Sequence, residues 1–484
     1  MENMHCLAVD MGAGSIRIML GTVSESAITI EEIYRFKNEI QVLNNSSKWD
    51  IGFIYKSIVK GINCALEKNK QITSIGIDSW GVDYALLDSL DNLLELPYSY
   101  RDSRTEGMKE KWNTIMSDEE TFQRTGINFY PFNTLFQLLS IKGNPNSASV
   151  GSILFLPNYI YFKLTGIKFN ELTIASSSQL LNVNSTVFDN EILKKLGIKP
   201  ELLPNIVQPG QVIGQLTDPA IQENNIKAVA VCSHDTASAV AALPALDTDF
   251  LYIATGTWCI LGIESETPLI SNEALQLGIT NERGINNTYR VLKNIIGLWL
   301  IQGIHKAMDV KLEYSELDQL AANTPETDHL VNPDDSSFYN PENMIEAFNN
   351  YFRKTNQSLP VSMGEYINCA YKSLALEFTY YINKFENITH VAYNTLHIIG
   401  GGSQSALLCQ NTANFSQKLV ESGPTESAVL GNIMVQGIAM KKIKDVTEGR
   451  KIIANSFPPS TFIPKLSKSK TDIIFNKFLE LKKI

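Results

Sequence analysis

An apolar run gives way abruptly to polar residues in the segment Lys227-Ala-Val-Ala-Val-Cys-Ser-His-Asp-Thr-Ala-Ser-Ala-Val-Ala-Ala-Leu-Pro244. The pattern predicts a strand that ends before Ser233, followed by a helix of small residues. In open α/β folds, ligands bind beyond the carboxyl ends of the strands, and a carboxylate there can reach a substrate hydroxyl. The segment therefore makes Asp235 a candidate catalytic base.

The same residues also have a purely structural interpretation. Asp and Thr before an alanine-rich run are frequent helix N-caps, and from this segment alone capping is the more frequent role. His234 has no second His or Cys at ligand spacing nearby, so a structural histidine is the ordinary expectation. Both interpretations stay open at this level.

Length and composition limit the classes of protein to consider. A chain of 484 residues predicts two domains, which we divide at 1–245 and 246–484 with Leu243–Asp249 as the connection. The formal net charge of −10 argues against a nucleic-acid partner, and no basic run suggests an anionic membrane surface. The six cysteines are scattered, which is typical of reduced thiols. With neither a secretory signal nor a long apolar run, the expected location is cytoplasmic.

A glycine turn near the N-terminus, Asp10-Met-Gly-Ala-Gly-Ser-Ile-Arg17, lies between strands expected at 7–9 and 16–23. The third glycine and the helix of a dinucleotide fingerprint are missing, so that motif is rejected. The backbone N–H groups and the hydroxyl of this turn could instead contact phosphate oxygens, with Arg17 meeting phosphate charge and Asp10 holding a metal-bound water. Glycine hairpins without a ligand are the common alternative.

A tryptophan beside a glycine follows the next predicted strand, 72–77, which comes after a helix expected over 50–70. The segment Asp78-Ser-Trp-Gly-Val-Asp-Tyr84 could form a sugar surface, with the ring on C–H faces and carboxylates on hydroxyls. A core tryptophan beside a surface turn is an equally good interpretation. The small polar patch Thr173–Gln179 either approaches such a pocket or caps helices.

The second half of the chain repeats the scheme of the first. Strands expected at 251–254 and 258–263 flank the turn Thr255-Gly-Thr257, which predicts duplicated domains facing a common cleft. A strand from Tyr289 should pass into a helix with Asn294 at the junction. Residues 322–343 are expected to be surface loop, and the Lys-rich tail 465–484 a solvated surface.

Three consecutive glycines follow a predicted buried strand in Leu396-His-Ile-Ile-Gly-Gly-Gly-Ser-Gln-Ser-Ala-Leu-Leu408. Bare backbone at Gly400–Gly402 would let a flat ligand or a phosphate lie against a helix N-terminus. A close contact between helix and sheet explains the glycines equally directly. A further helix should open in the segment Gly423–Asn432.

Taken in order, five segments resemble the FGGY carbohydrate kinases of the actin-like ATPase fold, over nearly the whole chain. They are Asp10–Arg17, Asp78–Tyr84, Ser233–Ser238, Thr255–Trp258 and Gly400–Gln404. The resemblance implies an α/β chain of two duplicated actin-like (ribonuclease H-like) domains flanking a catalytic cleft. It places the sugar site, the catalytic Asp and the first phosphate loop in 1–245 and the nucleotide site in 246–484.

The resemblance also implies a role for individual residues. Asp235 would be the catalytic base, with ATP and Mg²⁺ as cofactors and Asp10 holding the metal through water. The sugar would be bound by Gly81, His234, Asp235 and Thr236. The nucleotide would be bound by Ala13, Gly14, Ser15, Ile16 and Arg17 at its phosphates, and by Thr257, Asn294, Gln302 and Gly401. The family often carries glycine where this chain has Ile16, and a branched residue restricts the backbone there.

Several segments, among them Gly76–Asp83 and Ser233–Ala239, are similar to family members that act on L-rhamnulose. The expected reaction is transfer of the γ-phosphoryl group of ATP to the 1-hydroxyl of that ketose, by a monomer or a homodimer. The alternatives are a kinase for L-fuculose or D-xylulose, and a nucleotide-gated binding protein of actin-like fold without a base at residue 235. Candidates for the sugar pocket are Trp80, Tyr84 and Phe132 as an apolar wall, and Asp78, Asp83, Asn133 and His234 as hydroxyl partners.

Overall fold

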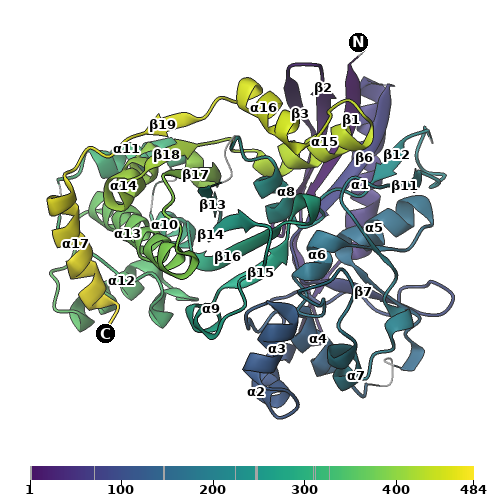
Figure 1. Cartoon of the computed structure of the whole chain (residues 1–484), viewed down its shortest axis with the longest axis horizontal. Coiled ribbons are helices and arrows are strands. Elements are labelled where there is room, and N and C mark those ends of the chain that lie inside the picture. Colours follow the sequence, from purple (N-terminus) through teal and green to yellow (C-terminus); the bar gives the residue numbers. More distant parts are fainter. Residues whose placement is uncertain are drawn as a thin grey trace. The chain divides into compact units, whose positions relative to one another are not determined.

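The computed structural model describes residues 3–69, 71–144, 148–223, 225–245, 249–308, 310, 312–325 and 327–483 (Figure 1). The chain forms two compact units. The first unit is Met1–Leu246, Glu264–Val291 and Ser427–Ser456, and the second unit is Asp247–Ile263, Leu292–Glu426 and Phe457–Ile484. Residues 246–248 of the expected connection Leu243–Asp249 lie outside the described residues. The division of sugar and nucleotide sites between 1–245 and 246–484 stays a prediction.

A mixed sheet of strand order β11-β12-β6-β1-β2-β3 forms the centre of the first unit. Its strands are β1 (Met4–Met11), β2 (Ser15–Val23), β3 (Ile28–Lys37), β6 (Ile72–Ser79), β11 (Val212–Gln215) and β12 (Lys227–Val229). Strands β1 and β2 pair antiparallel, which confirms the predicted glycine hairpin. Strand β6 runs parallel to both β1 and β12, so the carboxyl ends of these three strands meet at one edge of the sheet.

Apolar patterning accounts for the elements around this sheet. Strand β1 lies between two neighbours and is apolar on both faces, as expected for a strand covered on both sides. Helix α1 (Ile51–Lys68) begins at Asp50, whose side chain accepts a hydrogen bond from the N–H of Phe53 at 2.9 Å. Isoleucines recurring at helical spacing, at 51, 54, 58 and 62, are all buried against the sheet core. The predicted helix over 50–70 is confirmed.

Shorter elements complete the first unit. The strands are β4 (Ile40–Leu43), β5 (Ser46–Trp49), β7 (Tyr84–Leu87), β8 (Ser152–Phe155), β9 (Asn170–Glu171), β10 (Ile206–Val207) and β15 (Thr280–Arg283). The helices are α2 (Met108–Asn113), α3 (Asp118–Thr125), α4 (Thr134–Ile141), α5 (Leu156–Thr165), α6 (Leu172–Ser176), α7 (Asn190–Leu196), α8 (Asp235–Ala241), α9 (Asn272–Leu277), α15 (Ser427–Ala439) and α16 (Val446–Ser456).

Helices α8 and α15 pack against each other through small residues (Figure 1). A Cβ added at Gly431 of α15 would lie 1.8 Å from the carbonyl oxygen of Ser238 in α8. Such a distance is far inside van der Waals contact, so only glycine allows this approach. The small side chains of α8 predict a helix, and they also permit the close contact between α8 and α15.

The second unit repeats the sheet of the first. Its strands are β13 (Phe250–Thr255), β14 (Trp258–Ser265), β16 (Tyr289–Ile296), β17 (Thr395–Gly400), β18 (Leu419–Ser422) and β19 (Ser460–Phe462). The order of the sheet is β15-β16-β14-β13-β17-β18-β19, and its residues within Glu264–Val291, which include β15 and the start of β16, belong to the first unit. Strands β13 and β14 form an antiparallel hairpin, and β17 runs parallel to β13 and β18. This is the arrangement of β1, β2, β6 and β12, so the predicted duplication is confirmed.

The helices of the second unit are α10 (Trp299–Lys306), α11 (Tyr314–Ala322), α12 (Met344–Lys354), α13 (Met363–Thr389), α14 (Ala406–Ser416) and α17 (Lys468–Leu481).

Three expectations from the sequence are corrected in this unit. Asn294 lies inside strand β16, because the strand continues to Ile296 and α10 begins only at Trp299. The segment 322–343 is largely irregular, yet it buries Leu330, Val331 and Phe338. The C-terminal tail is not simply solvated, because Phe478 of α17 is fully buried.

The cysteines and the helices agree with the expectations from composition. All six cysteines are free, and all but Cys64 are buried. Within the described residues, none of the helices has the length and apolar character needed to cross a membrane. The cytoplasmic location and the monomeric or dimeric state stay predictions.

Candidate functional site

The loop Ser233–Thr236, at the carboxyl edge of the first sheet, comprises the last two residues before helix α8 and the first two residues of that helix. The N–H of Ser79, the last residue of β6, donates to the carbonyl of Ser233 at 2.9 Å. The buried carboxylate of Glu171 accepts from the N–H of Ser233 at 3.0 Å, and the hydroxyl of Thr173 accepts from the N–H of His234 at 3.2 Å. The loop is therefore fixed from two sides.

Asp235 is the first residue of helix α8, and the N-cap position belongs to His234. Its Oδ1 accepts a hydrogen bond from the N–H of the adjacent Thr236 at 2.6 Å, which is not the contact of an N-cap side chain. The side chain keeps 31% of its surface exposed. Desolvation by the surrounding protein nevertheless raises the pKa of Asp235 to about 6, against the opposing effect of His234. A partly accessible carboxylate of raised pKa is suited to general-base chemistry.

Two further carboxylates lie at the ends of neighbouring strands. Asp10 of β1 and Asp78 of β6 are partners in the parallel register. Asp78 is fully buried, and its Oδ2 accepts from the Nδ2 of Asn432 at 2.5 Å, while its Oδ1 has no hydrogen-bond partner among the described residues. Burial and the charge of Asp10 raise the pKa of Asp78 well above its usual value. The edge of the sheet is thus rich in carboxylates that repel one another.

These carboxylates fit a metal that is held mostly by other ligands. Within the described chain, no three His, Cys, Asp or Glu side chains form a group that could hold a metal ion. Mg²⁺ in nucleotide sites uses one or two carboxylates, retains waters and takes its remaining ligands from phosphates. The carboxylate of Asp10, whose side chain is partly exposed, suits such a role, whereas the Oδ1 of Asp78 is buried. Asp10 is also ion-paired with Arg17, so Arg17 does not point freely at a phosphate in this structure.

The predicted phosphate loop is a tight turn between β1 and β2. The N–H of Gly12 donates to the carbonyl of Ser15 at 3.1 Å, and Ala13 and Gly14 form the tip of the turn. Ile16 lies inside β2 opposite Met11, with its side chain fully buried in the core. A branched side chain suits this strand position, so the departure from glycine does not distort the backbone. Ser15 and Arg17 alternate with Ile16 and project to the other face.

Gly81 lies beside the ring of His234. A Cβ added at Gly81 would lie 3.2 Å from the Nε2 of His234 and 3.0 Å from the Oγ of Ser177. Two of the four predicted sugar residues are therefore neighbours. The other two also lie near this Nε2, with the Oγ1 of Thr236 at 3.3 Å and the Oδ1 of Asp235 at 3.6 Å. In the patch Thr173–Gln179, the hydroxyl of Ser177 donates to the carbonyl of Ile174 and that of Thr173 accepts from the N–H of His234, and a contact of the patch with a sugar stays a prediction.

The candidate sugar wall is only partly where the sequence suggested. Trp80 and Tyr84 are 7% and 5% exposed and belong to the cores beneath the loop. Phe132 is partly exposed and stacks on Tyr130, with ring centroids 5.2 Å apart, and its edge meets Tyr100. The apolar surface available near these segments is therefore the aromatic cluster of Tyr100, Tyr130 and Phe132.

Asp83 and Asn133 are committed to protein partners. The carboxylate of Asp83 accepts hydrogen bonds from the indoles of Trp49 and Trp80, the N–H of Tyr100 and the amide of Gln137. Burial still raises the pKa of Asp83 to about 6. The amide nitrogen of Asn133 donates to Asn128 and Gln179. Both side chains hold loops together, which removes Asp83 as a free hydroxyl partner.

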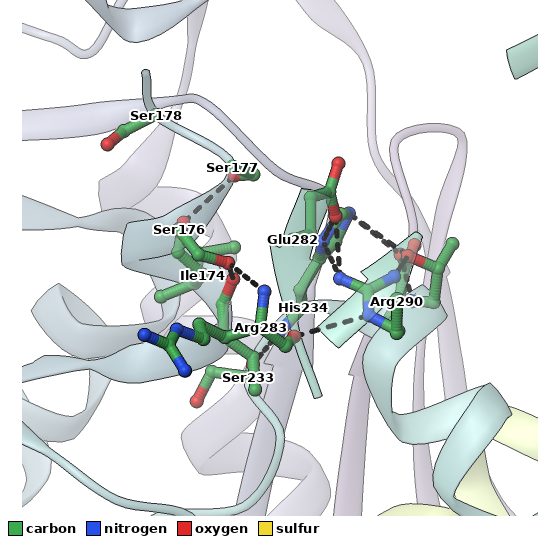
Figure 2. A network of polar contacts seen from close by, with 12 residues as sticks. Ile174, Ser176, Ser177, Ser178, Ser233, His234, Glu282, Arg283 and Arg290 are labelled. Carbon is green, nitrogen blue, oxygen red and sulfur yellow. Dashed lines mark hydrogen bonds and ion pairs between the residues drawn. The ribbon is translucent and has the colours of Figure 1, made fainter. Parts of the chain in front are cut away.

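Sequence reasoning missed four residues of this site. Three of them support the loop Ser233–Thr236: Glu171 accepts from the N–H of Ser233, Arg290 donates to Thr236, and Glu282 accepts from Arg290. The fourth, Asn432, donates to Asp78. Burial raises the pKa of Glu171 to about 7, although four protein donors bind it. Its position directly before the helix N-terminus of Leu172 was a weak signal. Figure 2 shows Glu282 and Arg290 beside the ring of His234.

The glycines Gly400–Gly402 of the second unit have different roles. Gly400 has a φ of +78°, and a Cβ there would lie 2.4 Å from the carbonyl of Thr255. A Cβ at Gly402 would lie 2.8 Å from the Thr255 side chain, whereas one at Gly401 would meet nothing within 4 Å. Gly400 and Gly402 therefore allow the close approach of strand β13, and Gly401 leaves its backbone open.

Gly401 lies on the wall of a cavity of about 910 Å³ within the second unit. The lining comprises residues 401–406 and 422–426, with Leu298, Tyr314, Asp318, Tyr371 and Phe457 among the others. The hydroxyl of Ser405 donates to Asp318 at 2.9 Å. A cavity of this size with aromatic side chains and bare glycine backbone suits a small organic ligand.

The other predicted nucleotide residues do not line this cavity within the described chain. Thr257 and Gln302 are brought together, with the Oγ1 of Thr257 3.3 Å from the Oε1 of Gln302. Gln302 lies one helical turn from the lining residue Leu298. Asn294 is half-buried on strand β16. The roles of Thr257, Asn294, Gln302 and Gly401 stay predictions.

Comparisons with known proteins agree with this geometry. Residues 5–242 match the model of the N-terminal domain of the FGGY family of carbohydrate kinases, and residues 251–440 match that of its C-terminal domain. A rhamnulokinase of Bacillus subtilis is 38% identical over 461 residues, which covers 95% of both chains. A rhamnulokinase of Pectobacterium carotovorum is 40% identical over 465 residues, covering 95% of this chain and 93% of the other.

Solved structures share the fold at low sequence identity. A gluconate kinase from Lactobacillus acidophilus has a TM-score of 0.82 at 16% identity and covers 100% of this chain and 98% of that chain. A glycerol kinase from Plasmodium falciparum with ADP has a TM-score of 0.81 at 17% identity, covering 99% and 98%. These similarities concern the two-domain α/β architecture alone.

Proposed function

The chain belongs to the FGGY family of carbohydrate kinases, and from that membership we propose that it transfers the γ-phosphoryl group of ATP to the 1-hydroxyl of L-rhamnulose. The products are L-rhamnulose 1-phosphate and ADP. The observation that carries the proposal is the environment of Asp235, a carboxylate beyond the strand ends with raised pKa and 31% exposure. The identity of about 40% to rhamnulokinases over nearly the full chain supports this choice of ketose.

Asp235 acts as the general base of the proposed reaction. As the oxygen of the 1-hydroxyl forms its bond to the γ-phosphorus, the bond between that phosphorus and the β,γ-bridging oxygen breaks. The hydroxyl proton passes to the carboxylate of Asp235, and the electron pair of the broken bond leaves with ADP. Such a transfer depends mainly on positioning and charge stabilisation, with a base contributing about 10² to 10⁴ in rate.

The remaining residues bind and orient the two substrates. Gly81, His234 and Thr236 of the first unit would contact the ketose, with Tyr100, Tyr130 and Phe132 as its apolar surface. The backbone of Ala13–Arg17 would meet the phosphates. The cavity at Gly401 would take the nucleotide, together with Thr257, Asn294 and Gln302. Mg²⁺, when bound with Asp10 nearby, would neutralise charge on the phosphates.

Two alternatives predict different results. A kinase of the same family for L-fuculose or D-xylulose would keep every phosphate contact and the base, and would differ only at the sugar. A nucleotide-gated binding protein would bind ATP without sugar-dependent turnover. The identities to rhamnulokinases do not favour either alternative.

A panel of ketoses tests the proposal. We expect the highest kcat/KM for L-rhamnulose, weaker activity on ketoses that share its hydroxyl arrangement near C3 and C4, and little activity on glycerol. The terminal methyl is worth only about 1 to 3 kcal/mol, whereas an inverted hydroxyl leaves a buried polar partner unpaired and is discriminated more strongly. Coupled ADP release measures each rate. A clear preference for L-fuculose or D-xylulose would overturn the choice of substrate.

The raised pKa of Asp235 predicts the pH dependence of activity. The base must be ionised to accept a proton, so kcat/KM for the ketose should be constant above pH 7 and fall as the pH drops through the pKa of about 6. Well below that value the fall should approach tenfold per pH unit. Initial rates between pH 5 and 8 measure the profile, with stability checked at each pH. A flat profile down to pH 5 would contradict the assignment of the base.

A further inference from the structure

A closed group of polar side chains surrounds the ring of His234 in the first unit (Figure 2). The Nδ1 of His234 lies 3.0 Å from the Oε2 of Glu282. Arg290 donates from Nη2 to the same Oε2 at 2.6 Å and from Nη1 to the Oγ1 of Thr236 at 2.7 Å. Thr236 in turn lies 3.3 Å from the Nε2 of the ring, which closes the group.

Glu282 and Arg290 form a buried ion pair. The side chain of Arg290 is fully buried and that of Glu282 is 11% exposed. Burial alone would raise the pKa of Glu282, but the charge of Arg290 and the contact with His234 hold it at about 2. Removing one partner would leave the other charge buried without compensation. The pair is therefore a fixed support behind His234 and Thr236, the two residues proposed to bind the sugar.

The distances favour one tautomer of His234, because Glu282 lies 3.0 Å from Nδ1 whereas the nearest carboxylate oxygen of Asp235 lies 3.6 Å from Nε2, beyond hydrogen-bond distance. A carboxylate only accepts hydrogen bonds and a guanidinium only donates, so Nδ1 can satisfy one of them. A bare Nδ1 would place its lone pair 3.0 Å from the carboxylate of Glu282, whereas a protonated Nδ1 donates to it. Arg290 lies 3.1 Å from Nδ1 but makes its shorter contact with Glu282. Glu282 therefore favours the proton on Nδ1.

The Thr236 hydroxyl agrees with this tautomer. Its oxygen already accepts from Arg290, so its own proton is available to the bare Nε2. The same Nε2 borders Gly81, where an added Cβ would lie 3.2 Å from it and 3.0 Å from the Oγ of Ser177, so any larger residue would crowd this side of the ring. A hydroxyl of a bound sugar that reached this point would find an acceptor on His234 and an oriented hydroxyl on Thr236.

We propose that Glu282 and Arg290 are positioning residues of the ketose site: they hold His234 with its proton on Nδ1 and its Nε2 as an acceptor, and they anchor Thr236. This inference rests on the proposed function for the identity of the ligand. It assigns no direct contact between the sugar and either residue. It predicts that the pair controls ketose affinity, while nucleotide affinity is independent of it.

Steady-state kinetics of Glu282→Gln test the inference. We expect KM for L-rhamnulose to rise roughly tenfold or more, the scale of a hydrogen bond to a charged group, with KM for ATP unchanged. Glu264→Gln is the matched control, because Glu264 pairs with Arg450 at 2.8 Å with similar burial and contacts neither His234 nor Thr236. That variant should keep the wild-type KM for the ketose. Equal ketose KM values in wild type and Glu282→Gln would overturn the inference.

A double variant separates positioning from stability. Glu282→Leu with Arg290→Met removes both charges, so the penalty of an unpaired buried charge disappears. If the pair positions His234 and Thr236, KM for the ketose stays raised although thermal stability recovers. If the double variant regains both stability and the wild-type KM, the pair is only structural and the inference fails.

The tautomer itself can be measured without activity. Histidine labelled with ¹⁵N gives long-range ¹H–¹⁵N spectra that distinguish the two tautomers and the charged ring, and His234→Asn assigns the signals among the six histidines. We expect a protonated Nδ1 and a bare Nε2 in the wild type, and a mixture in Glu282→Gln. A ring protonated at Nε2 in the wild type would overturn the inference. A wild type that phosphorylates no ketose would overturn the proposed function, and this spectrum would then decide the positioning inference alone.

Discussion

Asp235→Asn is expected to lower turnover by about 10² or more while the protein still folds and binds ATP and the ketose. The substitution keeps the size and most hydrogen bonds of the side chain but removes the ability to take a proton. Asn is as good a helix cap as Asp, so a capping role for Asp235 would survive the change. The substitution thus separates the two interpretations that the sequence left open.

The control for this variant is an aspartate that does cap a helix. Asp189 is the N-cap of α7 and accepts hydrogen bonds from the N–H groups of Glu191 and Ile192, both at 3.0 Å. Asp189→Asn should keep the wild-type rate. Single-turnover rates at saturating substrates, with binding measured by calorimetry, give the comparison. If Asp235→Asn turns over at the wild-type rate, Asp235 is a structural residue and not the base.

Among glycine-to-alanine substitutions in the first unit, Gly431→Ala should be the most destabilising. The added methyl group would lie 1.8 Å from a backbone carbonyl of α8, which cannot move away as a side chain can. Overpacking of this kind costs about 1 to 3 kcal/mol, and contact with backbone places the expected loss near the upper end. Because α8 begins at Asp235, activity should fall together with stability.

Gly437→Ala, on the same helix, is the matched comparison. Its added Cβ would lie 2.7 Å from the Cδ1 of Ile443, the far end of a flexible side chain. Ile443 can adjust, and alanine is the better helix former, so the free energy of unfolding should change much less. Urea denaturation of both variants measures the difference. Equal stability of Gly431→Ala and the wild type would mean that α8 and α15 are not packed as described.

Local patterns were enough to predict the framework of both units. The hairpins around Gly12 and Gly256, the helix from Ile51 and the strand before Gly400 all follow from apolar periodicity and glycine turns, which are encoded within a few residues. The C-terminal tail was misjudged because the burial of Phe478 depends on partners such as Leu376, about a hundred residues away. Periodicity identifies an amphipathic helix but does not say what covers it.

The position of the loop Ser233–Thr236 was predicted, and the residues that support it were not. Ser233–Thr236 is conspicuous because polar residues interrupt an apolar run. Glu171 and Glu282 contact this loop from 62 and about 50 residues away. The local sequence offers only the helix start after Glu171 as a weak signal, and nothing near Glu282 distinguishes it from a surface acid. The same limit explains Asp83, whose pairing with Trp49 no local pattern reveals. At Gly400–Gly402, the close-contact interpretation is confirmed for Gly400 and Gly402, and a ligand at Gly401 stays a prediction.

The proposed reaction transfers a phosphoryl group from ATP to one oxygen of L-rhamnulose, and the position of the phosphate in the product reveals whether it does. L-Rhamnulose labelled with ¹³C at C1 would be incubated with the enzyme, ATP and Mg²⁺, and followed by ¹³C and ³¹P NMR. We predict that the C1 resonance splits through coupling to phosphorus while one ADP forms for each sugar consumed. ADP formation without splitting at C1, or no ADP formation when the sugar is added, would contradict the account.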